Sequence, residues 1–193
     1  MKINPLGIIA GILMLALPFL GAWWIFGVGE LFILKISPFN VNVLMAGEQV
    51  ESPLFQGIAR GITLVVLITG ILVILGSFFA DRWWGVKLIR FGSFKVLNLV
   101  VSLALVAAVI LPVIGSRINQ MVNLPVEFNI PVQGEQIISY QQQGMSLSVS
   151  IYSNFTEVFF LACITAGIAI YSRIYLNKML KDMKGKTESS EEV

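Results

Sequence analysis

Few side chains in this chain of 193 residues are suited to catalysis. There is no histidine, so no imidazole is present as a metal ligand or as a general base near neutral pH. The single cysteine, Cys163, lies in an apolar run and has no partner for an intramolecular disulfide. Three acids lie near the ends of apolar segments, Glu30, Asp81 and Glu157, but they are isolated from one another. We therefore expect no enzymatic activity, no cofactor and no bound metal.

Arg60 and Glu157 are candidates for an ion pair. Each begins an apolar segment, and the two segments are predicted to run in the same direction, so the charges would share one depth. A partly desolvated charge costs less when it is paired. We expect this pair at the outer rim of a membrane. Glu30 is a competing partner for Arg60, and lipid head groups are the alternative.

A short pattern occurs twice in the chain. Residues 39–52 read FNVNVLMAGEQVES, and residues 128–139 read FNIPVQGEQIIS. Each copy lies between long apolar segments, which favours two tandem helix–β–helix units, by duplication or by equivalent local folding. The strands Phe39–Val43 and Phe128–Val132 would then be related by a pseudo-two-fold axis in one sheet. The acidic and amide residues after each glycine are candidate outer contact turns, although a plain turn is the simpler interpretation: Glu48, Gln49, Glu135 and Gln136.

Composition predicts a membrane protein. The chain is 56% hydrophobic and 12% charged, against about 45–50% and about 25% in soluble domains. A helix needs about 20 apolar residues to cross a bilayer. We therefore predict an α-helical integral membrane protein with four transmembrane helices and a small extracytoplasmic β-sheet. A cleaved signal peptide is the alternative for the first segment. The four spans are Pro5–Phe26, Gly61–Ala80, Val96–Ile114 and Phe155–Leu176.

The segments between these spans complete the predicted organisation of a single four-helix membrane domain over residues 1–193. Residues 27–56 form the first outer β-segment, in which 27–37 are either helix or strand. Residues 81–95 form a cytoplasmic loop, and 115–154 form the second outer β-segment. Residues 177–193 form a cytoplasmic tail, disordered from Gly185. Strands are expected at Val126–Val132, Gln136–Gln141 and Met145–Tyr152, the last because apolar residues alternate with serines.

The basic residues predict the orientation, because loops rich in Lys and Arg face the cytoplasm. The predicted outer segments contain only Lys35 and Arg117, with Arg60 at a helix start. We expect a multi-pass protein of the cell membrane with both termini in the cytoplasm. The basic residues of the loop and tail are Arg82, Lys87, Arg90, Lys95, Lys178, Lys181, Lys184 and Lys186.

Aromatic residues near the span ends are candidate membrane-interface anchors: Trp23, Trp24, Trp83 and Trp84. The second pair, with its neighbouring Lys and Arg residues, predicts contact with anionic lipid. A docking site for a cytoplasmic partner is the alternative.

Small residues four apart predict close helix packing in every span. The alternative is that these small residues pack between copies of the chain in a homo-oligomer. Polar residues within the spans are expected to form hydrogen bonds between helices rather than to line a path; they include Thr69, Ser77 and Thr165. The small pairs are Gly7 with Gly11, Gly57 with Gly61, Ala104 with Ala108, and Ala162 with Ala166.

This plan of four helices, cytoplasmic termini and an outer sheet resembles the claudin and peripheral-myelin-protein-like membrane proteins in topology. A claudin has a Trp-Gly-Leu-Trp element and a cysteine pair in its first outer segment, and neither occurs here. The resemblance implies at most an adhesion, barrier or accessory role. We expect a non-enzymatic membrane protein that presents an extracellular β-sheet for protein–protein contact or self-assembly. The alternatives are a small channel or transporter subunit, or an accessory subunit of a larger membrane complex. No nucleic-acid partner is expected.

Overall fold

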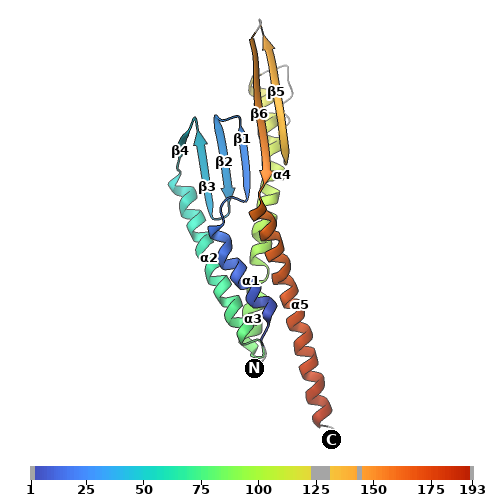
Figure 1. Ribbon diagram of the computed structural model, residues 1–193. Helices are drawn as coiled ribbons and strands as arrows, with labels where there is room; N and C mark the ends of the chain where they lie inside the picture. Colours follow the sequence, from blue (N-terminus) through green and yellow to red (C-terminus); the bar gives the residue numbers. More distant parts are fainter. Residues whose placement is uncertain (1–2, 123–130, 143–144, 192–193) are drawn as a thin grey trace. The chain divides into compact units, whose positions relative to one another are not determined.

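A computed structural model describes residues 3–122, 131–142 and 145–191. The chain divides into two compact units. The helical unit is Met1–Leu20, Thr63–Leu99 and Leu161–Val193, and the sheet unit is Gly21–Ile62 and Val100–Phe160. In chain order the elements are α1 (Pro5–Ala16), the 3-10 helix η1 (Leu17–Phe19), β1 (Trp24–Val28), β2 (Phe32–Ser37), β3 (Asn40–Met45), β4 (Glu48–Val50), α2 (Pro53–Phe78), α3 (Trp83–Gly92), α4 (Lys95–Val122), β5 (Gly134–Gln142), β6 (Met145–Phe155) and α5 (Glu157–Glu191) (Figure 1).

The predicted combination of helices with an antiparallel sheet is present, and the sheet has six strands. In the described part of the chain, three helical stretches are long and apolar enough to cross a membrane, which is compatible with a membrane protein: Pro53–Phe78, Trp83–Val109 and Glu157–Lys181.

The first apolar helix is shorter than the predicted span Pro5–Phe26. It ends at Ala16, and η1 continues it only to Phe19. Pro18 explains the end, because proline has no N–H for the helix and its ring clashes with the preceding turn. Gly21 then takes a positive φ of 100°, and the aromatic and β-branched residues that follow favour a strand. Together α1 and η1 rise about 24 Å, less than the ~30 Å of bilayer hydrocarbon.

Other predicted boundaries also shift. Residues 27–37 are strand, in β1 and β2. The predicted loop at 81–95 contains α3, and α4 extends to Val122 into the predicted second outer β-segment. The tail is not disordered from Gly185, because α5 is helical to Glu191. A helix that continues an existing one avoids the cost of nucleation, which exceeds the roughly 1 kcal/mol that a glycine adds.

Asn4 fastens the start of α1 inside the helical unit, where its side chain is 0% exposed. Its Oδ1 accepts the N–H of Gly7 and caps the helix, as expected for asparagine at this position. Its backbone N–H donates to Ser77 O at 2.9 Å. Its Nδ2 donates to Ser172 O at 3.1 Å. One buried residue therefore bonds α1 to both α2 and α5.

Glycines allow α1 to pack closely on α2. A methyl group added at Gly11 would lie 2.9 Å from Gly70 O, and one added at Gly70 would lie 3.1 Å from Gly11 O. A methyl group at Gly7 would collide with the Ser77 side chain. The close packing of α1 that the pair Gly7 and Gly11 predicted is confirmed. The pair Gly57 and Gly61 meets nothing within 4 Å in the described structure.

Helix α3 packs in the same close manner. Gly85 lies against the backbone oxygens of Phe79 and Gly76, and Gly92 lies against Val73. Ile89, on the same side of α3, is fully buried in a cluster with Ala80 and Leu176. α3 is therefore fixed to α2 and α5.

The sheet unit is antiparallel throughout, with strand order β4-β3-β2-β1-β6-β5. β1 lies between β2 and β6, so it joins the β1–β4 meander to the β5–β6 hairpin. The hairpin extends beyond β1, because only Ile151–Phe155 of β6 pair with that strand (Figure 1). The predicted strands at 136–141 and 145–152 are confirmed by β5 and β6. The predicted strand at 126–132 falls largely outside the described residues.

The two copies of Gly-Glu-Gln begin the two edge strands. Gly47 and Gly134 both have positive φ, 86° and 117°, and β4 and β5 follow them. However, β4 pairs with the strand before it, whereas β5 pairs with the strand after it. The second Phe-Asn strand, at Phe128, lies outside the described residues. The duplication and its pseudo-two-fold axis stay a prediction.

The close contact of Gly11 with α2 leads to a stability prediction. We expect Gly11→Ala to lower the free energy of unfolding by about 1–3 kcal/mol, because the methyl group meets a backbone oxygen. The matched control, Gly57→Ala, should be neutral or stabilising by about 0.5–1 kcal/mol, because alanine favours helix at an open site. Thermal unfolding in detergent measures both. Equal losses in the two variants would contradict the proposed packing.

Candidate functional site

One face of the sheet is almost entirely apolar. Residues paired across antiparallel strands share a face, and three rows of partners define this one. We call it the apolar face. Its rows are Val41–Ile36–Trp24–Phe155, Val50–Val43–Leu34–Phe26–Ser153–Gly134, and Glu48–Met45–Phe32–Val28–Ile151–Gln136.

The apolar face is buried at one side and open at the other. Trp24, Phe26 and Ile151, on β1 and β6, are buried at 4%, 8% and 3% exposure. The β2 and β3 members are half-buried. Towards the β4 edge, Met45 is 53% and Val50 is 48% exposed. Exposed large apolar side chains grouped on one surface are typical of interaction sites.

Aromatic contacts order the buried side of the apolar face. Trp24 stacks on Phe26 with ring centroids 6.0 Å apart, and Phe26 meets Phe32 edge-on at 6.2 Å. The Trp24 Nε1–H donates to Ser153 Oγ at 2.8 Å, and that hydroxyl donates to Val132 O at 2.9 Å. Ser153 therefore satisfies an indole and a backbone carbonyl in a site where it is itself 0% exposed.

Trp23 is buried as well, in contact with Phe39 and Phe159 at centroid distances of 5.6 and 6.3 Å. Its Nε1–H has no hydrogen-bond partner in the described structure. Trp23 and Trp24 therefore do not expose their rings as membrane-interface anchors would, which corrects that expectation. Because α1 ends as early as Ala16, these two tryptophans lie beyond the helix and are buried in the core of the sheet unit. Trp83 and Trp84 are exposed, at 71% and 37%.

The opposite face of the sheet is mixed. It includes Lys35, Asn42 and Asn154 together with Ile33. Tyr152 lies directly over Gly27, where any side chain would collide with its ring. An aromatic ring over a strand glycine restores packing that the missing side chain would have supplied.

The four candidate contact-turn residues lie on the two edge strands. Glu48 and Gln49 are exposed on β4, and Gln49 Nε2 donates to Asn42 Oδ1 and to Glu51 Oε1, each at 3.4 Å. On β5, Glu135 pairs with Tyr152 and Gln136 pairs with Ile151. The sheet thus places the two turns on opposite edges, not in one joint site. A contact role for them stays a prediction.

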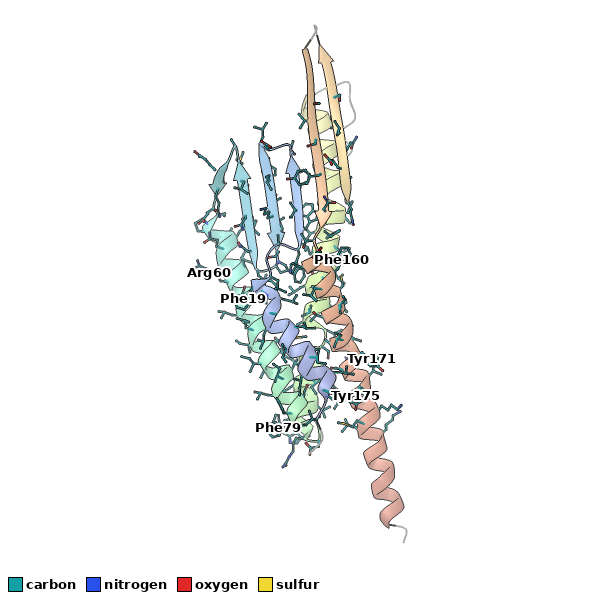
Figure 2. All side chains as sticks on the ribbon, viewed as in Figure 1. Phe19, Arg60, Phe79, Phe160, Tyr171 and Tyr175 are labelled. Carbon is teal, nitrogen blue, oxygen red and sulfur yellow. The ribbon has the colours of Figure 1, made fainter. Side chains whose placement is uncertain are left out.

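The expected ion pair is absent. Arg60 and Glu157 are both exposed, and neither forms an ion pair with any residue that the structure describes. Arg60 projects from the first part of α2 (Figure 2).

The buried hydroxyls bond within their own helices. Thr69, Ser77 and Thr165 donate to the carbonyl oxygens of Val65, Val73 and Leu161, four residues earlier. This corrects the expectation of hydrogen bonds between helices through these side chains. A hydroxyl satisfied by its own helix neither links helices nor offers a polar lining for a path.

No cluster of three or more histidine, cysteine or carboxylate side chains suited to a metal ion occurs among the described residues. A shallow groove runs along α5, lined by Tyr171, Ile174, Tyr175, Lys178 and Met179 (Figure 2). All of these lining residues lie on one face of α5, so the groove is a surface depression rather than an enclosed cavity.

The sequence matches no known family model, and a search of curated proteins finds no match.

The Ser153 hydrogen bonds lead to a second prediction. Ser153→Ala leaves a buried indole N–H and a carbonyl without partners, so we expect a loss of about 2 kcal/mol in stability. The matched control, Ser148→Ala, changes an exposed serine of the same strand and should stay within about 0.5 kcal/mol of wild type. Thermal unfolding in detergent distinguishes them. Similar values for both would show that the Trp24–Ser153 bond contributes nothing.

Proposed function

We propose that the protein is a non-enzymatic integral membrane protein that presents its six-stranded sheet outside the cell membrane for protein–protein contact. The observation that carries this proposal is the apolar face, open at the β4 edge, where Met45 and Val50 are about half exposed. An apolar sheet face of this kind gains free energy when a partner surface removes it from water. The proposed partner is either a second copy of the chain or a different membrane protein.

The charge distribution supports the proposed membrane placement. Three stretches have sufficient length and apolarity to span: α2, residues Trp83–Val109 of α3 and the first part of α4, and Glu157–Lys181 of α5. We propose α1 as the fourth span, with residues 20–23 extending the path beyond η1, since extended chain covers about 3.3 Å per residue. Basic residues concentrate in and around α3 and in α5 beyond Arg173. By the positive-inside rule these segments face the cytoplasm, and the sheet faces outward.

Cysteine labelling tests this orientation. Cysteines at Asn42 and Ser148, on the sheet, should react with a membrane-impermeant maleimide in intact cells. A cysteine at Asp81, which is exposed between α2 and α3, should react only after permeabilisation. Cys163 is replaced by alanine in all variants to remove background. The reverse pattern would overturn the orientation and, with it, the outer sheet.

Photo-cross-linking tests the contact role. A photoreactive residue at Val50, on the apolar face, should give a discrete adduct in native membranes. The same residue at Gln49, on the other face of β4, is the control and should give little adduct, because a photoreactive group reacts only with atoms that it touches. An adduct of twice the chain mass of 21.2 kDa would indicate self-assembly, and another mass a different partner. No adduct at Val50, or equal adducts at both positions, would refute contact through the apolar face.

The topological resemblance to claudin-like proteins agrees with such a role and adds no residue to it. An adhesion, barrier or accessory role would each use an outer contact surface. The identity of the cross-linked partner would decide among them.

A further inference from the structure

A second surface lies within the helical unit, at the seam where α3 packs against α5. Arg90 of α3 donates from Nη2 to Asn177 Oδ1 of α5 at 3.1 Å. Arg173 of α5 lies over the ring of Phe94, just beyond the end of α3, with the guanidinium carbon 5.0 Å from the ring centroid. From Arg90 the chain advances four residues to Phe94, past the end of α3 at Gly92, while on α5 it steps back four residues from Asn177 to Arg173. The two contacts are therefore consecutive rungs, and we call them the arginine seam.

Both arginines of the seam keep N–H donors available. A guanidinium has five N–H donors in a planar fork. Asn177 accepts from Arg90 and is neutral. Phe94 contacts Arg173 through its ring and is also neutral, and this type of contact leaves the edge donors of the guanidinium open. Neither arginine forms an ion pair within the described chain, so the positive charge of the seam is not compensated there.

Two lysines, one in α3 and one at the start of α4, add to this charge. Lys87 Nζ lies 4.5 Å from the ring centroid of Trp83, and Lys95 Nζ lies 4.6 Å from that of Phe91. The rings are 71% and 56% exposed. Cations interleaved with exposed aromatic rings are typical of a segment at the bilayer interface.

The seam rests on a rigid support. Ile89, between the exposed positions of α3, is 0% exposed and packs with Ala80 and Leu176. Because Gly85 and Gly92 have no side chains, α3 packs closely on the backbone of Phe79 and on the side chain of Val73. Because this helix is held in place, little further ordering is needed when a ligand binds, and that saving strengthens binding.

We propose that the arginine seam binds the phosphate head group of an anionic phospholipid. The guanidinium fork matches a phosphate with two parallel hydrogen bonds. On α5 the two contacts are four residues apart, about 6 Å of helical rise, and we propose that both arginines serve one head group. Uncompensated positive charge favours a lipid with net negative charge over a zwitterionic one. The proposal uses the membrane placement argued above but not the contact role of the sheet.

The test uses the full chain purified in a neutral detergent. We expect phosphatidylglycerol to raise the Tm by about 3–5 °C, as for a ligand present well above its Kd. Phosphatidylcholine and inorganic phosphate should each change the Tm by less than about 1 °C on the same reasoning. The double variant Arg90→Gln, Arg173→Gln should lose the shift. The matched control, Lys178→Gln, removes an exposed charge from the groove face of α5 and should keep it.

Several results would overturn the proposal. An equal shift with inorganic phosphate would identify a free-ion site, and an equal shift with phosphatidylcholine would show that net charge is not recognised. A double variant that keeps the phosphatidylglycerol shift would exclude the seam. If that variant fails to fold, Arg90→Lys, Arg173→Lys keeps the charge without the fork and should lose at least half of the shift; full retention would contradict the proposal. Cysteine labelling and cross-linking are independent readouts, so the two proposals fail separately.

Discussion

The helical unit depends on one buried polar residue. Asn4 is removed from water, and three of its hydrogen bonds go to three different helices: the side-chain cap to α1, the backbone N–H to α2 and the amide N–H to α5. A buried amide without partners would cost several times what a single satisfied hydrogen bond contributes. The three helices must therefore meet at this residue for it to be buried at all. Asn4 thus acts as a positional constraint as well as a source of stability.

If these helices lie in a bilayer, as proposed, close packing replaces the hydrophobic effect as the main attraction between them. In a bilayer, lipid tails are as apolar as leucine, so helices gain little by merely hiding apolar side chains from lipid. The contacts of Gly11 with Gly70 and of Gly85 with Gly76 bring backbones together, which increases dispersion contact. Gly76, Gly85 and Gly92 hold α3 in place, and α3 carries exposed cations and aromatic rings. Close packing on α3 therefore supports the arginine seam.

The sheet unit differs from the helical unit in how its apolar side chains are buried. β1 is the strand that links the meander to the hairpin, and its Trp24 and Phe26 are buried together with Ile151 of β6. Burial then decreases through β2 and β3 towards β4. A sheet that served only as a stable cap would not need an apolar face at its exposed edge. The cost of leaving Met45 and Val50 in water is offset if a partner covers them, which is the physical basis of the proposed contact role.

Several features followed from the sequence alone. Low charge and long apolar runs predicted helices able to cross a membrane, and alternation of apolar residues with serine in Met145–Tyr152 predicted a strand, because both signals are local. The small pair Gly7 and Gly11 predicted close packing of α1. Other features were decided by tertiary structure. Trp23 and Trp24 follow an apolar run and suit a membrane interface, but Pro18 ends the helix early and places them in the sheet core. Arg60 and Glu157 were expected at equivalent helix starts, but α2 begins at Pro53, so Arg60 lies about two turns into its helix, whereas Glu157 begins α5. Gly57 and Gly61 share the spacing of Gly7 and Gly11 but face no neighbour in the described structure. Spacing identifies residues on one helical face, whereas only the packing of the whole chain determines which face is covered.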